Sequence, residues 1–469
     1  MPSMRVMQDH VGIGDPHINS DNRSRLGIMA HVFEALVCRT DTGGYVAGLA
    51  ERWQLSDDAY SWEFTLREAR FHDGSSLHAA DVVASLCRVR DEDLPGELGT
   101  GGVYRSYLAG SSIQALDSHR VSVRSAEPMA DLLDILVALP IVPAHSLEHL
   151  PQQLIGSGRY RLDSWDAQQV SLQPFADYWG QAAELQQLDF IAEANPEARL
   201  EALLSGQVDF INHVPIAQRP LLAQSGHLVS APSSVCTTLM FNLQRDGLCQ
   251  DKRLRQALNY GIDIQAVLGR ILPDAAQAIN GPFSRYNLGF DPQRPPYPHN
   301  PSKAKALLAE AGYQGETLHI DVPTRIPDEA PEVTELLREQ LESIGVDLQL
   351  HFHQDRSAYA DMVRAKKLQD AAFFDSSPMS SYRLIREKFH SEVQALWWLG
   401  YHNDEVNAAF AQAQRSPDLE TRRRLYQRMQ HRIHDDAPWL FLYNPYEAWG
   451  VGAKAKGWQP QPGGLLVLA

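Results

Sequence analysis

The stretch LAERWQLSDDAYSWEFTLREARFHDGSSLHAADVVASL, residues 49–86, brings a strand pattern, a turn and a helix pattern together in one short segment. Within it, Trp62, Phe64 and Leu66 alternate with polar residues, as in a strand with one buried face. Asp73 and Gly74 are typical turn residues, and they are followed by the helical pattern of ADVVASL. No nucleophile elbow or phosphate loop occurs here, so we interpret the stretch as scaffold for recognition.

The same alternation of strands and helices continues further along the chain and predicts a mixed α/β protein. LHIDV, residues 318–322, reads as a strand, and VDLQLHF, residues 346–352, alternates like a half-buried one. Gly345 supplies the stop of the helix between them. The segment is therefore predicted to be a βαβ unit. The apolar face of its helix consists of Val333, Leu336, Leu337, Leu341 and Ile344.

Two further helices have clear signals. In NPSKAKALLAEAGY, residues 300–313, Asn300 is placed to cap the helix start, Pro301 fits its first turn and Gly312 fits its end. The second helix runs to a stop before Pro438, and an aromatic strand follows it. Its predicted inward residues are Leu425, Met429 and Ile433.

Length and composition bound the possible functions. The chain has 469 residues, 44% hydrophobic and 21% charged, and so predicts two or three folded lobes. The formal net charge of −16 disfavours nucleic acid as a partner. No apolar run approaches the ~20 residues of a membrane span, and the first residues have no signal-peptide core. Taken alone, that beginning favours the cytoplasm, although a trimmed export signal would leave the same beginning.

Motifs for catalysis and metal binding are missing from the sequence. There is no HExxH, GxSxG or GxxxxGK[ST], which lowers the expectation of an enzyme without excluding a scattered triad. Cys38, Cys87, Cys236 and Cys249 form no CxxC pair, and separate buried thiols are the favoured interpretation. A disulfide between Cys236 and Cys249 is the less favoured alternative.

At residues 49–86 the chain resembles extracellular solute-binding protein family 5, the dipeptide, oligopeptide and nickel receptors of ABC importers. Matching segments occur throughout the chain. They are DPHINSDNRSRLGIMAHVFEALV (15–37), GSGRYRLDSWD (156–166), FADYWG (175–180), MFNLQRDGLCQDKRLRQALNYGID (240–263), NPSKAKALLAEAGY (300–313), YHNDEVNAAFAQAQ (401–414) and DDAPWLFLYNP (435–445).

The resemblance implies a periplasmic-binding-protein-like α/β fold of the cluster C type, three-lobed with a hinged ligand cleft. Lobe one would comprise residues 1–42, 158–240 and 447–469. Lobe two would be residues 43–157 and lobe three residues 241–446. The turn clusters at 39–45 and 154–162 lie at two of these crossings. A solute would be held between lobes one and three.

Candidate ligand contacts follow from this resemblance, in the third-lobe segment of residues 370–403. Trp397, Trp398 and Tyr401 offer rigid area with polar tips, although core packing is an equal alternative. Asp375 could pair with a ligand ammonium, or could instead cap the next helix. Peptide receptors of the family typically carry a longer Asp-rich loop here, and the shorter loop of this chain, residues 375–381, weighs against ordinary peptides.

Other charged residues are weaker candidates. Arg383 and Arg386, one helical turn apart, could bind a carboxylate, as could Arg88, Arg90 and Arg105, although solvated charge is the commoner explanation for each. The sequence shows no metal site. The residues considered for metal or chelate capture are His10, His17, His31 and His402 together with Met29, and none has a ligand spacing beyond chance.

The leading hypothesis is a non-enzymatic receptor for a short peptide or amino-acid conjugate, without a cofactor, that delivers its solute to an ABC permease. A nickel or metallophore receptor on the same fold is the alternative, and a peptide hydrolase is the third. A transcription regulator with this fold would need a DNA-binding extension, which we do not expect here. The receptor would be monomeric and periplasmic or extracellular, soluble or lipid-anchored, and would meet the membrane only through its permease.

Overall fold

The computed structural model describes residues 3–18, 23–40, 43–91, 93–94, 103–461 and 463–468. The described chain divides into two compact units. Unit 1 consists of residues 1–231 and 447–469, and unit 2 of residues 232–446. The predicted lobe boundary at residue 42 lies outside the described residues, and the division into three lobes stays a prediction.

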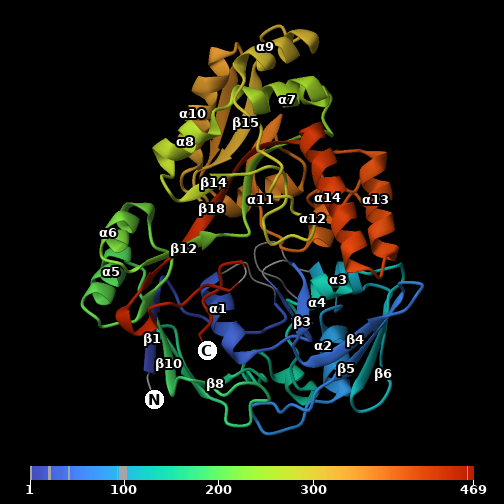
Figure 1. Ribbon diagram of the computed structural model, residues 1–469, viewed down its shortest axis with the longest axis vertical. Coiled ribbons are helices and arrows are strands. Elements are labelled where there is room, and N and C mark those ends of the chain that lie inside the picture. Colours follow the sequence, from blue (N-terminus) through green and yellow to red (C-terminus); the bar gives the residue numbers. More distant parts are fainter. Residues whose placement is uncertain are drawn as a thin grey trace. The chain divides into compact units, whose positions relative to one another are not determined.

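Unit 1 contains the first part of the chain (Figure 1). Its helices are α1 (Arg23–Val32), α2 (Ala79–Arg88), α3 (Val103–Leu108), α4 (Leu132–Leu136), α5 (Pro196–Leu204) and α6 (Arg219–Gln224). Its strands are β1 (Ser3–Gln8), β2 (Val37–Arg39), β3 (Tyr45–Ala47), β4 (Ala50–Leu55), β5 (Ser61–Leu66), β6 (Ser112–Ala115), β7 (Arg120–Arg124), β8 (Tyr160–Trp165), β9 (Gln169–Pro174), β10 (Gln187–Ala192), β11 (Phe210–Ile211) and most of β12 (Leu228–Pro232).

The larger sheet of unit 1 has the order β11-β1-β10-β9-β8. Strand β1 is parallel to both β10 and β11, whereas β9 is antiparallel to β10 and to β8. Helix α1 contributes Ile28 and Val32 to the core over this sheet, together with Val6 of β1 and Phe190 of β10. Three parallel strands therefore bring their carboxyl ends to one edge, next to residues 8, 192 and 211.

The smaller four-stranded sheet of unit 1 has the order β4-β5-β7-β6. The predicted strand of the opening stretch is β5, and Trp62, Phe64 and Leu66 are all buried, as predicted. The predicted helix is α2, in which the Asp81 carboxylate accepts a hydrogen bond from the backbone N–H of His78 at 2.8 Å. The stretch is therefore scaffold, because its apolar face is used inside unit 1.

Unit 2 combines a sheet with helices (Figure 1). Its helices are α7 (Lys252–Gly261), α8 (Ile264–Ile271), α9 (Pro301–Glu310), α10 (Ala330–Ser343), α11 (Arg356–Arg364), α12 (Ser381–Lys388), α13 (Asp404–Arg415) and α14 (Leu419–Asp436). Its strands are β13 (Cys236–Phe241), β14 (Ala276–Ala278), β15 (Leu318–Pro323), β16 (Leu348–His353), β17 (Ala371–Ser376) and β18 (Trp439–Val451), whose last residues belong to unit 1.

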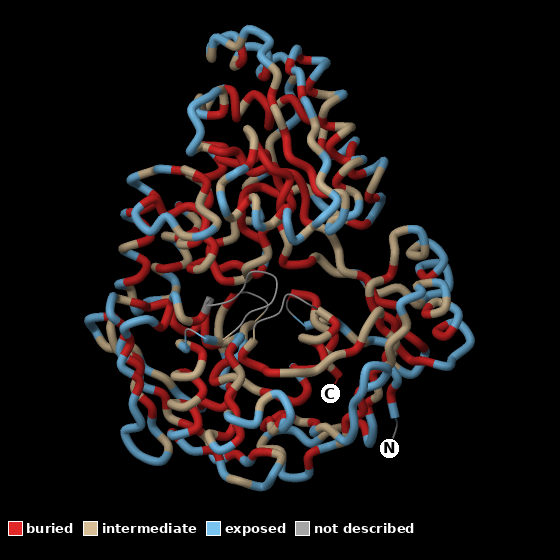
Figure 2. The backbone as a smooth tube through the Cα atoms, turned by 180° about the vertical axis from the view of Figure 1, so that it is seen from behind, coloured by how far each residue is buried: buried red, intermediate tan, exposed pale blue. Residues whose placement is uncertain are grey.

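The sheet of unit 2 has the order β16-β15-β17-β13-β18. Strands β15 and β16 are parallel with α10 between them, so the predicted βαβ unit is confirmed. Strand β17 is also parallel to β15, while β13 is antiparallel to β17. Asn300 caps α9 as predicted, because its side chain accepts a hydrogen bond from the Lys303 N–H. Figure 2 shows buried backbone along the central strands.

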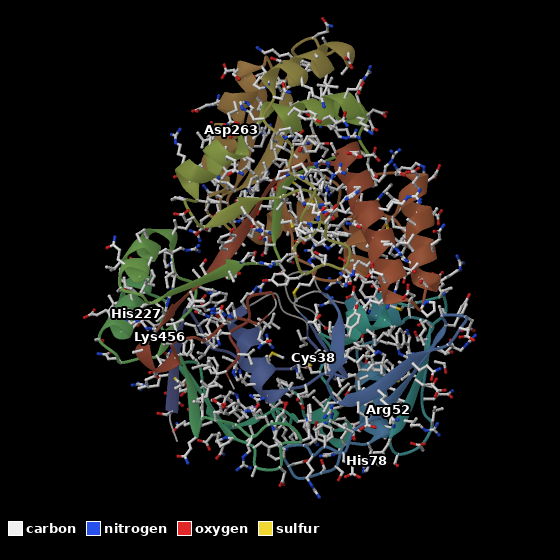
Figure 3. All side chains as sticks on the ribbon, in the orientation of Figure 1. Cys38, Arg52, His78, His227, Asp263 and Lys456 are labelled. Atoms are coloured by element: carbon white, nitrogen blue, oxygen red, sulfur yellow. The ribbon has the colours of Figure 1, made fainter. Side chains whose placement is uncertain are left out.

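The four cysteines are all free thiols, so the Cys236–Cys249 disulfide is not formed. Cys236 and Cys249 are buried as predicted, and burial raises the pKa of each thiol to about 12. The prediction of burial is wrong for Cys38, which is exposed on β2 (Figure 3). In the described ranges, no helix combines the length and the apolar character needed to span a bilayer.

Gly156 lies against the backbone of α1 and its following residues. A Cβ at this position would lie 1.9 Å from the carbonyl oxygen of Val32, a distance that no real contact tolerates. The neighbouring N–H of Gly158 donates to the same carbonyl. The glycines of GSGRYRL are therefore required by close backbone packing rather than by a left-handed turn.

We expect Gly156→Ala to lower the free energy of unfolding by about 3 kcal/mol, at the upper end of the cost of an inserted methyl group, because the obstacle is backbone. Urea unfolding measures this change. Gly269→Ala is the control, since nothing lies within 4 Å of a Cβ there and α8 gains a better helix former. Equal stability of the two variants would contradict the packing argument.

Candidate functional site

Ligands of open α/β sheets bind at the carboxyl ends of parallel strands, so a site is expected at these ends. In unit 2, β15, β16 and β17 end at Pro323, His353 and Ser376. The polar residues of the strand-end cluster are Asp375, Ser376, Arg356 and Lys388. Phe374 and Trp397 are its aromatic neighbours, with ring centroids 5.4 Å apart. The cluster therefore combines both signs of charge with flat aromatic surface.

Asp375 and Arg356 form the partly exposed ion pair of the cluster. Arg356 Nη2 lies 3.6 Å from Asp375 Oδ1, and the side chains are 23% and 31% exposed. Arg356 Nε donates to the carbonyl of Ile326, and its guanidinium lies 4.9 Å from the Phe374 ring centroid. The helix-cap alternative for Asp375 is wrong, because Ser380 caps α12 by accepting from the Arg383 N–H at 3.0 Å.

Lys388 is a buried cation behind this ion pair. Its side chain is held among the rings of Phe374, Trp397 and Trp439, each within about 6 Å of Nζ. The described hydrogen bond of Nζ is a long one, 3.4 Å, to the carbonyl oxygen of Asp375. Burial lowers the pKa of Lys388 to about 8, against the opposing effect of the nearby carboxylates.

Ser376 adds a second group without full hydrogen bonding. Its Oγ atom is buried and has no partner among the described residues. Such a hydroxyl costs stability, as does a buried ammonium with one weak hydrogen bond. Groups that lower stability in this way concentrate at functional sites. Lys388 and Ser376 were not found by reading the sequence, and the only available signal was their position at or after the strand ending in DAAFFDS.

Two other predicted third-lobe residues, Trp398 and Tyr401, form hydrogen bonds within unit 2. Trp398 Nε1 donates to the carbonyl of Tyr401 at 2.7 Å. Tyr401 is buried, and its hydroxyl donates to Asp436 at 2.9 Å. Burial raises the pKa of Tyr401, and the Asp436 charge adds to the effect. The structure therefore accounts for Tyr401 as a core residue, and a contact with solute stays a prediction.

Arg383 and His402 also have nearby partners. Arg383 Nε donates to Glu387 at 3.0 Å, one turn along α12. His402 Nδ1 lies 2.9 Å from Ser391 Oγ, and its Nε2 lies 3.3 Å from Asp404. Of the predicted third-lobe residues, the structure brings Asp375 and Trp397 into the strand-end cluster. Ligand contacts by Arg383 and His402 stay predictions.

Two of the cationic candidates of unit 1, Arg88 and Arg90, bind different groups of their own unit. Arg88 pairs with Asp15, its Nη1 donating to Oδ1 at 2.8 Å, and Arg90 donates to the carbonyl of Ser111. Arg105 is partly buried on α3. The contacts of Arg88 and Arg90 anchor loops within unit 1. The two side chains are therefore not simply solvated surface charges, which was the commoner explanation expected from the sequence.

The histidines considered for metal capture have other partners. His31 is buried between the carbonyl of Gly27 and the N–H of Leu468. His17 is also buried and lies 2.9 Å from the carbonyl of Pro140. Burial lowers the pKa of each imidazole to about 4. Throughout the described ranges, no three His, Cys, Asp or Glu side chains are grouped in a way that could hold a metal ion.

Unit 1 has its own cavity at the carboxyl ends of its parallel strands. Gln8, at the end of β1, and Asn212 and His213, directly after β11, line one side. The remaining lining residues are Arg23, Gly27, Phe190, Glu447, Trp449, Gly464 and Leu466. This cavity was missed by the sequence analysis, because its walls come from six separate segments of the chain.

The chain that carries these two sites matches a known family of proteins. Residues 44–381 match the sequence pattern of the bacterial extracellular solute-binding proteins, family 5. The chain belongs to this family, whose members serve as the solute receptors of ABC importers. The predicted family and its role in transport are thereby confirmed, and the family is one of solute receptors.

The most similar curated relatives include glutathione-binding proteins GsiB. The protein from Salmonella typhimurium is 25% identical over 414 residues, which cover 84% of this chain and 79% of the relative. The protein from Pectobacterium atrosepticum is 25% identical over 417 residues, with the same coverage.

Solved structures share the fold along nearly the whole chain. HbpA2 from Haemophilus parasuis superposes with a TM-score of 0.85 at 21% identity, covering 99% of this chain and 98% of that one. NikZ from Campylobacter jejuni in complex with Ni(L-His) gives 0.76 at 20% identity, covering 98% and 97%. These likenesses confirm the predicted α/β, periplasmic-binding-protein-like fold.

We expect Lys388→Met to raise the free energy of unfolding at pH 7 by about 2 kcal/mol, because it removes a buried cation whose pKa is lowered from 10.5 to about 8. The unfolded wild-type chain holds this proton up to a higher pH, so this residue makes wild-type stability rise between about pH 8 and 10.5. The variant should lose that rise.

Urea unfolding at pH 7 and pH 9 measures both effects. Lys367→Met, at an exposed position, is the control and should leave the stability nearly unchanged. A destabilised Lys388→Met protein would show that the ammonium is a net stabilising contact of the core.

Trp398 allows its two possible roles to be separated in one variant. Because Trp398 is only half-buried, Trp398→Ala should cost less than the ~3 to 5 kcal/mol of a fully packed tryptophan. A solute contact would lose ~2 kcal/mol or more of binding. Calorimetry and denaturant unfolding give both quantities. A collapsed unfolding midpoint with affinity retained by the folded fraction would assign Trp398 to the core.

Proposed function

We propose that this protein captures a short peptide or an amino-acid conjugate and delivers it intact to the permease of an ABC importer. The observation that carries the proposal is the strand-end cluster of unit 2, in a chain of family 5. Asp375 supplies a carboxylate for a ligand ammonium, and Arg356 supplies a guanidinium for a ligand carboxylate. Trp397 adds flat area beside them.

Glutathione is the first solute to test. The curated relatives are named for glutathione binding, and that compound is a conjugate of three amino acids with one ammonium and two carboxylates. Its ammonium is opposite in charge to Asp375, and its carboxylates are opposite in charge to Arg356. The short loop of residues 375–381, which contains the Ser380 cap of α12, also favours such a conjugate over a longer peptide.

The nickel alternative takes its support from NikZ, which has a related fold and is described in complex with Ni(L-His). Because no three metal-ligating side chains meet among the described residues, a metal would have to arrive within an organic chelator. Trp397 and Arg356 would then contact the organic part of that chelator. Elemental analysis of the purified protein decides between the two solutes.

The remaining features of the proposal concern the cell. We propose a monomer outside the cytoplasmic membrane, soluble or lipid-anchored, with three lobes that close over the solute by hinge motion. The protein would meet the membrane only through its permease.

We expect isothermal calorimetry to detect glutathione or a dipeptide such as Ala-Ala with a micromolar or tighter dissociation constant. Asp375→Asn should weaken that binding by about tenfold or more, because an ammonium would lose its charged partner. Glu51→Gln, an exposed carboxylate elsewhere in the chain, is the matched control and should bind as the wild type does.

Mass spectrometry of the mixture after prolonged incubation completes the test. A receptor returns the solute in full, whereas a peptide hydrolase consumes it catalytically. If neither glutathione nor any dipeptide binds, and the purified protein carries nickel in a chelator, the metallophore alternative replaces the proposal.

A further inference from the structure

The cavity of unit 1 has one polar wall rich in hydrogen-bond acceptors. Asn212 is 5% exposed, and its Oδ1 atom is buried without a partner among the described residues. Its Nδ2 donates to Gln8 Oε1 and Ser24 Oγ, both at 3.2 Å, which fixes the orientation of the amide. An acceptor held in this way binds a donor from outside its own network.

The rest of the described lining combines Glu447, Arg23 and His213 with two aromatic rings and Leu466. The Glu447 carboxylate is 25% exposed and lies 3.7 Å from Arg23 Nε, beyond hydrogen-bond distance. Phe190 and Trp449 are nearly fully buried and form the apolar part, together with Leu466. A carboxylate, an amide oxygen and aromatic rings are the groups that recognise a cation carrying N–H donors.

The size of the cavity narrows the ligand further. The cavity is partly open, and the room within it is of the order of one water molecule, close to the size of an –NH₃⁺ group. A quaternary ammonium or a guanidinium is larger than this. We therefore propose that the cavity of unit 1 is a binding site for a primary ammonium group.

This inference deepens the proposed function by naming the solute class. If the protein is a solute receptor, the solute carries a free primary amine. The formal net charge of −16 favours association with such a cationic group. A solute with a single amine can place it either in this cavity or on Asp375 of unit 2, and the experiment below separates the two positions.

The direct test uses methylammonium chloride and does not depend on the identity of the solute. The indole N–H resonance of Trp449, assigned by comparison with Trp449→Phe, reports on the cavity wall. We expect a saturable shift with a millimolar dissociation constant, the limit for a ligand of two non-hydrogen atoms. Tetramethylammonium chloride, equal in charge but too large and without N–H donors, should produce no saturable shift.

Two variants locate the binding. Glu447→Gln should weaken methylammonium by about tenfold, because the charged acceptor is lost. Glu51→Gln, with the same change of charge on exposed β4, and Asp375→Asn should leave it unchanged. Absence of a saturable shift, or an equal shift with tetramethylammonium, would overturn the proposal and leave a cavity for solvent only.

A second experiment compares the binding affinities of glutathione and Ala-Ala with those of their N-acetylated forms. We expect acetylation to reduce affinity at least tenfold, and Glu447→Gln to do the same for the free amines only. Loss of affinity in Asp375→Asn but not in Glu447→Gln would assign the amine to unit 2 and refute this site as the amine position. If no free amine binds while methylammonium does, the receptor proposal fails and the ammonium site stands.

Discussion

The parallel pairing of β15 with β16 and β17 is the constraint on which the candidate site of unit 2 depends. In a parallel sheet the chain must cross over between strands, so every strand ends at the same edge. Pairing of Asp321 with Ala372 and of Pro323 with His353 sets the register. A shift of one residue would turn Asp375 to the other face and separate it from Arg356.

Burial then gives the strand-end cluster its chemistry. Asp375 keeps contact with solvent, while Lys388, beneath three aromatic rings, does not. Lys388 lies next to Asp375, whose charge would raise the pKa of the lysine, but burial lowers this pKa more strongly. The described hydrogen bond of the ammonium is a long one. A core selected for stability alone would place a hydrocarbon side chain there. The Lys388 ammonium therefore retains hydrogen-bonding capacity that a further polar group would satisfy.

Local patterns made the elements predictable, whereas contacts between distant residues were not predictable. Alternation identified β5, and cap and stop residues identified α9 and α10. The family resemblance identified Asp375 as a candidate. However, no local signal shows that Tyr401 meets Asp436, 35 positions away, or that Ser380 replaces Asp375 as the cap. These outcomes depend on tertiary packing, which decides whether an aromatic residue lines a site or fills a core.

Both candidate sites lie at the carboxyl ends of parallel strands. They differ in how many of their polar and charged groups already have a partner within the protein. In unit 2, Arg356 and Lys388 already stand beside Asp375, so an incoming cation must compete with two resident ones. In unit 1, Asn212 Oδ1 has no partner among the described residues, and Glu447 has Arg23 only at 3.7 Å. Because an unmet acceptor gains more from a new donor than a partnered one does, Asn212 Oδ1 is the acceptor with most to gain, whereas Arg23 already offsets part of the Glu447 charge. Within unit 2, the guanidinium of Arg356 is the group suited to a ligand carboxylate, so each unit offers a different kind of charge for recognition.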